Sequence, residues 1–263
     1  MARDKRLIIG NWKMNLDVHG ASMYLHKLSE KIQARRDVEV IVAPTMLALQ
    51  TLSTQVNLRQ MKLAAQNFYW RDNGSFTGEV SATQLRGIVQ YGIIGHSERR
   101  HMFNESDKDT RAKVQAAIRN HIRPVLCVGE TIHERTNGET EMVLHDQLVG
   151  GLANVTSEEL DQVVIAYEPV WAIGTGVNAK PDDVAKAIKS IRSQLTHLYG
   201  KQAANATQVI YGGSVTDVSA SDYLALEDID GLLIGAASLD AHVFNEIVKK
   251  AHRGNKAAKG GGK

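Results

Sequence analysis

The chain has 263 residues, of which 43% are hydrophobic and 23% are charged, so it can bury a large core. The formal net charge of +2 at pH 7 is too small to require nucleic acid or an anionic membrane as a partner, and no apolar run is long enough to span a membrane. Cys127 is the only cysteine, which excludes a disulfide within the chain and fits a reducing compartment. We therefore expect a cytoplasmic protein.

Short runs rich in β-branched and other apolar residues recur along the chain, each followed by a polar break. Continuous apolar runs of this length are typical of parallel strands that are buried on both faces. The eight predicted strands are, in chain order, 7–10, 38–43, 62–66, 91–94, 124–128, 162–166, 208–211 and 231–234.

Amphipathic patterns between these runs predict helices, most clearly at 24–34, 107–120, 142–152, 181–198 and 241–252. Alternating strands and helices favour an α/β fold with a parallel sheet. Eight such units fit a closed (β/α)8 barrel, in which helices ring eight parallel strands. An open, doubly wound sheet would need a dinucleotide fingerprint, which the first strand lacks because no second glycine follows Gly10 at the required spacing.

No linker rich in glycine, serine or proline divides the chain, so residues 1–252 are predicted to form a single barrel domain. Residues 253–263 are small and basic and predict a flexible C-terminal tail. Binding of phosphate or nucleic acid by this tail stays open, although a frayed, solvated terminus is the simpler interpretation.

Catalytic side chains of such barrels lie at the carboxyl ends of the strands. Polar residues and glycines that directly follow predicted strands therefore converge on one mouth and form one candidate site. They are Asn11, Lys13, His96, Ser97, Glu98, Glu168, Gly212, Gly213, Ser214 and Gly235.

The segment 163–176 combines a buried strand, one carboxylate and a loop closed by glycines. Pro169 disfavours helical geometry at Glu168, so the carboxylate leaves the strand in an extended pose. A base beneath a lid suits proton abstraction in a pocket without water. A buried structural glutamate beside an ordinary loop is the alternative. The predicted lid consists of Pro169, Val170, Trp171, Ala172, Ile173, Gly174, Thr175 and Gly176.

His96 stands before a predicted helical turn, where the positive end of the helix dipole favours a neutral imidazole that can donate to a carbonyl. Lys13 would supply positive charge to a substrate anion or enolate. Glu98 would either hold Lys13 or cap its own helix. A structurally satisfied histidine and a solvated lysine are the alternatives, and only their convergence with Glu168 argues for catalysis.

The pair Gly212-Gly213 before Ser214 exposes successive backbone N–H groups, as a phosphate site requires, although a plain tight turn would look the same. Gly235 after the eighth strand could complete the site. Cys127 is expected to be a small buried hydrophobe. The histidines show no metal-ligand spacing with one another or with Cys127, so no metal is predicted. Met46, Leu47 and Leu49 are expected in a helix core.

Eight motifs follow one another along almost the whole chain. They are Gly10-Asn11-Trp12-Lys13-Met14-Asn15, Gln66-Asn67, Phe76-Thr77-Gly78-Glu79-Val80-Ser81, Gly95-His96-Ser97-Glu98-Arg99-Arg100, Cys127-Val128-Gly129-Glu130, Tyr167-Glu168-Pro169-Val170-Trp171-Ala172-Ile173-Gly174-Thr175-Gly176, Tyr211-Gly212-Gly213-Ser214 and Asp230-Gly231-Leu232-Leu233-Ile234-Gly235. In this order they closely resemble the triosephosphate isomerase family. Each motif alone is modest, but the set is highly specific.

The resemblance implies reversible interconversion of dihydroxyacetone phosphate and D-glyceraldehyde 3-phosphate, in glycolysis and gluconeogenesis, without a cofactor. The family is itself the standard example of a glutamate base, a neutral histidine and a closing lid, which here would be Glu168, His96 and residues 169–176. Lys13 and Asn11 would help His96 to stabilise the enediolate oxygens. The implied supporting residues are Ser97 and Glu98, and the implied phosphate-binding residues are Gly174, Ser214, Gly235 and Ala236.

The segment 73–79 resembles the loop that this family inserts into a partner subunit, so a homodimer is implied. The predicted dimer loop comprises Phe76, Thr77, Gly78 and Glu79, and the apolar Phe76 argues against a plain surface loop. Two departures from the family pattern are noted. Ala236 stands where the family usually has glycine, which keeps the N–H but adds a methyl group, and the hinge 177–179 is a less common version.

Two other functions compete with the isomerase. Another barrel enzyme acting on a phosphorylated sugar or a tryptophan precursor would keep the phosphate site but change the catalytic groups. A barrel retained as a binding or adhesion protein would be expected to lose a catalytic residue. The joint presence of Asn11, Lys13, His96 and Glu168 argues against both.

Overall fold

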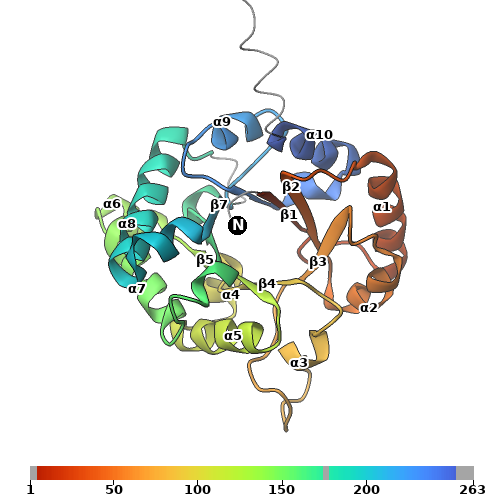
Figure 1. The fold of residues 1–263 in the computed structure, drawn as a ribbon, viewed down its shortest axis with the longest axis horizontal. Helices are drawn as coiled ribbons and strands as arrows, with labels where there is room; N and C mark the ends of the chain where they lie inside the picture. Colours follow the sequence, from red (N-terminus) through yellow and green to blue (C-terminus); the bar gives the residue numbers. More distant parts are fainter. Residues whose placement is uncertain (1–4, 174–177, 253–263) are drawn as a thin grey trace, which may run out of the picture.

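The computed structural model describes residues 5–173 and 178–252. Within them, eight parallel strands follow one another around a closed barrel, and β8 (Gly231–Ile234) pairs back onto β1 (Arg6–Asn11). Helices surround the strands as a ring (Figure 1). The predicted (β/α)8 barrel is confirmed.

The strands and helices alternate along the chain. The remaining strands are β2 (Val38–Ala43), β3 (Met61–Ala65), β4 (Tyr91–Ile94), β5 (Arg123–Val128), β6 (Val164–Tyr167) and β7 (Gln208–Tyr211). The α-helices are α1 (Val18–Lys31), α2 (Met46–Gln55), α3 (Ala82–Leu85), α4 (Ser97–Met102), α5 (Asp107–Arg119), α6 (Ile132–Thr136), α7 (Thr140–Leu152), α8 (Pro181–Ala206), α9 (Ala220–Leu224) and α10 (Ala241–Ala251). Short 3-10 helices lie at η2 (Leu160–Gln162), η3 (Val170–Ala172) and η4 (Ala236–Leu239).

Each strand divides its side chains between two cores because successive residues point to opposite faces. In β1, Leu7 and Ile9 belong to the core inside the barrel, whereas Ile8 packs into the larger core between the strands and the helices. Cys127 lies in the inner core and is buried, as expected. Both faces of the strands are therefore apolar, which explains their continuous hydrophobic sequences.

Several element boundaries differ from prediction because local hydrogen bonds override the hydrophobic pattern. The sixth strand begins at Val164 rather than at residue 162, since the 3-10 turn η2 precedes it. Helix α1 begins six residues earlier than predicted, because the Asp17 side chain caps it by accepting the Gly20 N–H at 2.7 Å. A residue in non-helical geometry, Gly200 with φ +82°, interrupts α8 just after the predicted end of the helix.

The expectation that Leu47 lies in a helix core is wrong. Its side chain is 83% exposed, whereas Ala48, Leu49 and Leu52 form the buried face of α2 and Met46 packs against the core. The first turn of α2 is apolar on all sides, so periodicity could not show which residue faces solvent.

One connection projects beyond the ring of helices. It joins β3 to α3 and carries the predicted dimer loop (Figure 1). Among the described residues, no helix is long and apolar enough to cross a membrane. The predicted tail, 253–263, lies outside the described residues.

Replacement of Gly129 by alanine is expected to lower the midpoint of thermal unfolding. A Cβ at this position would lie 1.9 Å from the Glu168 carbonyl oxygen, so the ends of β5 and β6 must separate. Overpacking of this kind typically costs about 1–3 kcal/mol. Gly20→Ala in α1 is the matched control, because its Cβ would meet side-chain atoms only, the nearest an Asp17 oxygen at 3.1 Å. Equal unfolding midpoints for the two variants would contradict the expectation.

Candidate active site

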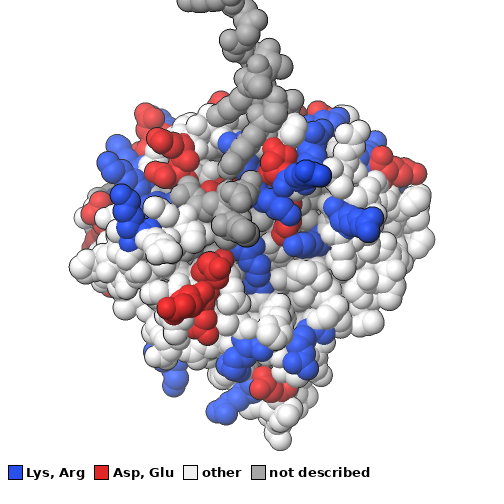
Figure 2. Space-filling view, in the orientation of Figure 1, with Lys and Arg blue, Asp and Glu red and all other residues white. Residues whose placement is uncertain are grey.

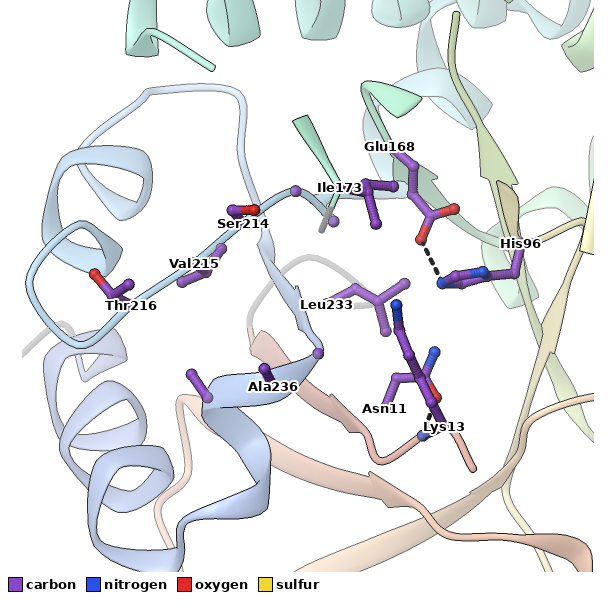
Figure 3. Close-up of a pocket in the computed structure, with 14 residues that line it drawn as sticks. Asn11, Lys13, His96, Glu168, Ile173, Ser214, Val215, Thr216, Leu233 and Ala236 are labelled. Carbon is purple, nitrogen blue, oxygen red and sulfur yellow. Dashed lines mark hydrogen bonds and ion pairs between the residues drawn. The ribbon is translucent and has the colours of Figure 1, made fainter. Parts of the chain in front are cut away.

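A cavity of about 490 Å³ opens at the carboxyl ends of the strands. Figure 3 shows that Glu168 and His96 face one another there, with Asn11 and Lys13 near them and Ser214 and Ala236 across the cavity. The residues lining it are Asn11, Lys13, His96, Glu168, Ile173, Gly212, Gly213, Ser214, Val215, Thr216, Leu233, Gly235, Ala236 and Ala237.

The Glu168 carboxylate is 2% exposed and held from two sides. Its Oε2 accepts the backbone N–H of Ser97 at 3.0 Å, and its Oε1 lies 3.2 Å from Nε2 of His96. The main chain fixes the base as well, since the Glu168 N–H donates to Val128 O at 2.8 Å and Pro169 follows. These two contacts of the carboxylate come from the start of α4.

His96 is the N-cap of α4, and this position determines its tautomer. Nδ1 accepts the backbone N–H of Glu98 at 3.2 Å, so Nδ1 carries no proton. A neutral imidazole then has its proton on Nε2, the nitrogen that faces Glu168. The role expected from the sequence, donation to the carbonyl of a substrate, remains a prediction.

Lys13 occupies a strained backbone conformation, with φ +52°. Side chains on both sides hold it: Asn11 Oδ1 accepts its N–H at 3.1 Å, and Gln66 Nε2 donates to its carbonyl at 2.9 Å. Its ammonium group pairs with Glu98 Oε1 at 2.5 Å. Of the two roles weighed for Glu98, the structure shows the contact with Lys13.

The glycines after β7 allow a turn that a larger residue would block. A Cβ at Gly213 would lie 2.0 Å from the Tyr211 hydroxyl, and one at Gly212 would lie 3.0 Å from Cγ of Glu168. Among the described residues, the N–H groups of Gly213 and Ser214 donate to no acceptor in the chain. Two amides beside the cavity are thus free to bind an anion.

The second half of this anion site comes from the end of β8. Gly235 lies beside the lysine, since a Cβ there would be 3.6 Å from Cε of Lys13. Ala236 begins η4, so its N–H has no acceptor within that short helix. A positive charge and several amide groups therefore surround one end of the cavity.

The described part of the predicted lid, Pro169–Ile173, is anchored at its start. The Trp171 indole N–H donates to Glu130 Oε1 at 2.9 Å. The Arg135 guanidinium stacks on the same indole, with its Cζ 4.3 Å from the ring centroid. Burial raises the pKa of Glu130. The Ser214 hydroxyl donates to the Ala172 carbonyl at 2.6 Å. Gly174, Thr175, Gly176 and Val177 lie outside the described residues.

Leu233, Val215, Thr216 and Ala237 line the cavity but were not among the predicted site residues. Leu233 is an apolar strand residue of β8 that belongs to the core inside the barrel, and no signal in the sequence distinguishes it from the other buried strand residues. The predicted dimer-loop residues lie elsewhere, in the projecting connection, where Phe76 packs on Tyr69 with ring centroids 4.5 Å apart. No cluster of three or more metal-ligating side chains occurs among the described residues.

Comparison with known proteins decides the family. The family model described as triosephosphate isomerase matches residues 6–251. The chain belongs to the triosephosphate isomerase family. The triosephosphate isomerase of Chloroherpeton thalassium is 42% identical over 249 residues, which is 94% of this chain and 99% of that protein. Those of Clostridium perfringens (40% over 243 residues) and Trichlorobacter lovleyi (41% over 244 residues) cover 92% of this chain and 98% and 97% of their own lengths.

NMR of enzyme labelled with ¹⁵N-histidine is expected to show the His96 ring in the state that its contacts imply. Nδ1 should resonate as an unprotonated nitrogen and Nε2 as a protonated one, because Nδ1 accepts the Glu98 N–H. The chain has 10 histidines, so the loss of one signal pair in His96→Gln identifies the correct ring. A proton on Nδ1 of His96 would contradict the assignment.

Proposed function

We propose that the chain interconverts dihydroxyacetone phosphate and D-glyceraldehyde 3-phosphate through an enediolate. Membership of the triosephosphate isomerase family supports this reaction. The observation that carries the proposal is the placement of one buried carboxylate, one imidazole and one lysine side chain around a cavity of suitable size. Asymmetry within the cavity, with amides at one end and Glu168 at the other, orients a phosphorylated three-carbon substrate.

Glu168 is proposed as the base. It takes a proton from the carbon beside the carbonyl; the electron pair of that C–H bond forms the C=C bond of the enediolate, and the π pair of the carbonyl moves onto its oxygen. Return of the proton to the neighbouring carbon completes the isomerisation. In the present structure the carboxylate contacts Ser97 N–H and His96, so bound substrate must replace these contacts before the base can reach the carbon.

His96, Lys13 and Asn11 are proposed to stabilise the oxygens. The Nε2–H of His96 donates to a substrate oxygen and can pass the proton from one oxygen to the other. Asn11 uses its carbonyl oxygen to fix Lys13, which leaves its NH2 group as a donor toward the cavity. Glu98 orients the lysine, and Ser97 holds the carboxylate until substrate arrives.

The phosphate is proposed to bind the amides of Ser214, Gly235 and Ala236. Ser214 and Ala236 lie across the cavity from Glu168 (Figure 3), and Lys13 lies next to Gly235. Ala236 keeps the N–H that a phosphate oxygen needs, so the departure from the family's usual glycine is compatible with binding. Gly174 and the rest of the lid remain predictions.

A homodimer is proposed from the apolar side chains that this chain leaves in solvent. They follow four consecutive strands of the barrel: Met14 (94% exposed) lies in the connection after β1, Leu47 in the first turn of α2, Phe76 in the connection after β3, and Met102 and Phe103 at the end of α4. Contiguous exposed apolar groups mark interaction surfaces. The exposed position of Leu47, unexpected from its sequence, is explained if a second copy covers it.

The remaining proposals concern cofactor, partners and location. The reaction needs no cofactor or metal, since both proton and charge are handled by side chains. On the face seen in Figure 2, acidic and basic side chains are interspersed, and the near-neutral net charge supports neither a nucleic-acid nor a membrane partner. The single cysteine, Cys127, can form no disulfide within the chain, which suits a reducing cytoplasm.

Glu168→Gln is expected to reduce kcat by roughly 10²–10⁴, the usual contribution of a general base. A coupled assay with glyceraldehyde 3-phosphate measures turnover, and exchange of carbon-bound hydrogen with solvent deuterium measures proton abstraction. Glu158→Gln, at an exposed position, is the control. A fully active Glu168→Gln would disprove the base assignment, and a wild-type chain that exchanges no hydrogen would favour the binding-protein alternative.

The double variant Phe76→Asp/Thr77→Asp is expected to be monomeric, because two charges would be buried in the proposed interface. Sedimentation velocity measures the oligomeric state. Leu58→Asp is the matched control: Leu58 is an exposed apolar residue in the connection that leads into the amino end of β3. The interface is misassigned if the double variant sediments like the wild-type dimer, or if the control dissociates as well.

A further inference from the structure

The peptide groups on both sides of Gly95, directly before His96, are held by charged side chains. The Gly95 N–H donates to Oε1 of Glu105 at 2.9 Å, and its carbonyl accepts from Nε of Arg100 at 2.8 Å. Gly95 has φ +68°, a left-handed conformation that favours glycine. A Cβ there would lie 2.8 Å from Arg100 and 2.9 Å from Thr110. A side chain at this position would collide with both groups.

The carboxylate of Glu105 is in turn held by two cations. Its side chain is 2% exposed, and Oε2 accepts from Arg99 Nε at 2.5 Å and from Lys113 Nζ at 2.7 Å. Burial opposes the charge, but Lys113, Arg99 and the Gly95 N–H together hold the pKa of Glu105 below its ordinary value. Lys113 also donates to Asn67 Oδ1 at 2.7 Å. Such a fully paired cluster is rigid, since loss of any partner leaves a buried charge unpaired.

Arg100 is held just as firmly on the other side of the peptide. Its NH1 group pairs with Asp107 at 2.6 Å, and its NH2 group donates to the Cys127 carbonyl at 3.3 Å. Cys127 is a residue of β5, next to the strand that carries Glu168. The guanidinium therefore ties the Gly95 carbonyl to the neighbouring strand of the barrel.

We propose that Glu105 and Arg100 are positioning residues that set the direction of the His96 ring and of the Ser97 N–H. His96 and Ser97, which contact the Glu168 carboxylate, follow Gly95 within two residues, so rotation of the clamped peptide would displace both. This inference rests on the proposed isomerase function. Neither Glu105 nor Arg100 lines the cavity, and both act through the backbone.

The predicted effect of losing this clamp is on turnover more than on binding. The amides proposed to bind phosphate follow β7 and β8 and do not depend on Gly95, so KM should change little. The imidazole, in contrast, must point at the substrate oxygens, and displacement of a catalytic group by 1 Å can cost about 10²-fold in rate. Loss of kcat with a preserved KM is the signature of an interaction needed in the transition state.

Steady-state kinetics and the ¹⁵N spectrum of His96 test the proposal on three variants. Glu105→Gln keeps the side-chain shape, but its amide cannot accept from Gly95 and both cations at once. Arg100→Met removes the contact with the Gly95 carbonyl, and Arg100→Lys restores one donor. We expect kcat to fall about 10- to 100-fold in the first two, KM to change less than about threefold, shifted or broadened His96 signals, and partial recovery in Arg100→Lys.

Asp230→Asn is the matched control for stability. Asp230 is 2% exposed and pairs with Arg192 at 2.5 Å, at the amino end of β8 and away from the cavity. The Asp230→Asn variant should have a lower midpoint of thermal unfolding, with kcat and the His96 signals unchanged. If Glu105→Gln fails to fold, Arg100→Met still tests the proposal. This variant is expected to fold, because the Asp107 carboxylate that loses its partner is accessible to solvent.

Two results would overturn the proposal: kcat in the folded variants within twofold of Asp230→Asn, or a loss of kcat with unaltered His96 signals. Failure of the proposed function would look different. In that case the wild-type chain itself would not turn over triose phosphates, whereas the His96 signals would still report whether the clamp orients the ring.

Discussion

Closure of the barrel by pairing of β8 with β1 is the constraint on which the rest of the structure depends. Gly10 lies opposite Ile234 in this pairing, so the residues that follow the two strands meet although more than two hundred positions separate them. Lys13 and Gly235 become neighbours in this way. Strand order then places Glu168 and His96 beside the same opening, because parallel strands deliver all their carboxyl ends to one face.

Helix α4, although short, organises most of the site's polar contacts. The residue that caps it is His96, and the cap bond leaves the Nε2 proton facing the cavity. The next N–H, from Ser97, holds Glu168, and the following side chain, Glu98, holds Lys13. One turn of helix sets all three contacts, so side chains outside this turn must fix its orientation. The cluster around Gly95 has this role.

Many features of this protein follow from the sequence by itself. A strand that is buried on both faces has a continuous apolar sequence, and a helix that is buried along one stripe has an amphipathic one. These two patterns therefore predict the alternating strands and helices. The residues just after the runs indicate where the site lies, and the motifs from Gly10-Asn11 to Ile234-Gly235 identify the family. Pro169 after Glu168 and the glycines at 212 and 213 also have direct backbone consequences.

Other features depend on contacts between residues distant in the chain, which only the tertiary structure decides. The apolar first turn of α2 gives no sign that Leu47 faces solvent, because its sequence lacks a polar side. Whether Glu98 binds Lys13 depends on how the β1 and β4 ends meet, and Leu233 reaches the cavity through the register of β8. The buried Glu105 looks like an ordinary charged loop residue until the fold surrounds it with Arg99 and Lys113 and places the backbone before His96 against it.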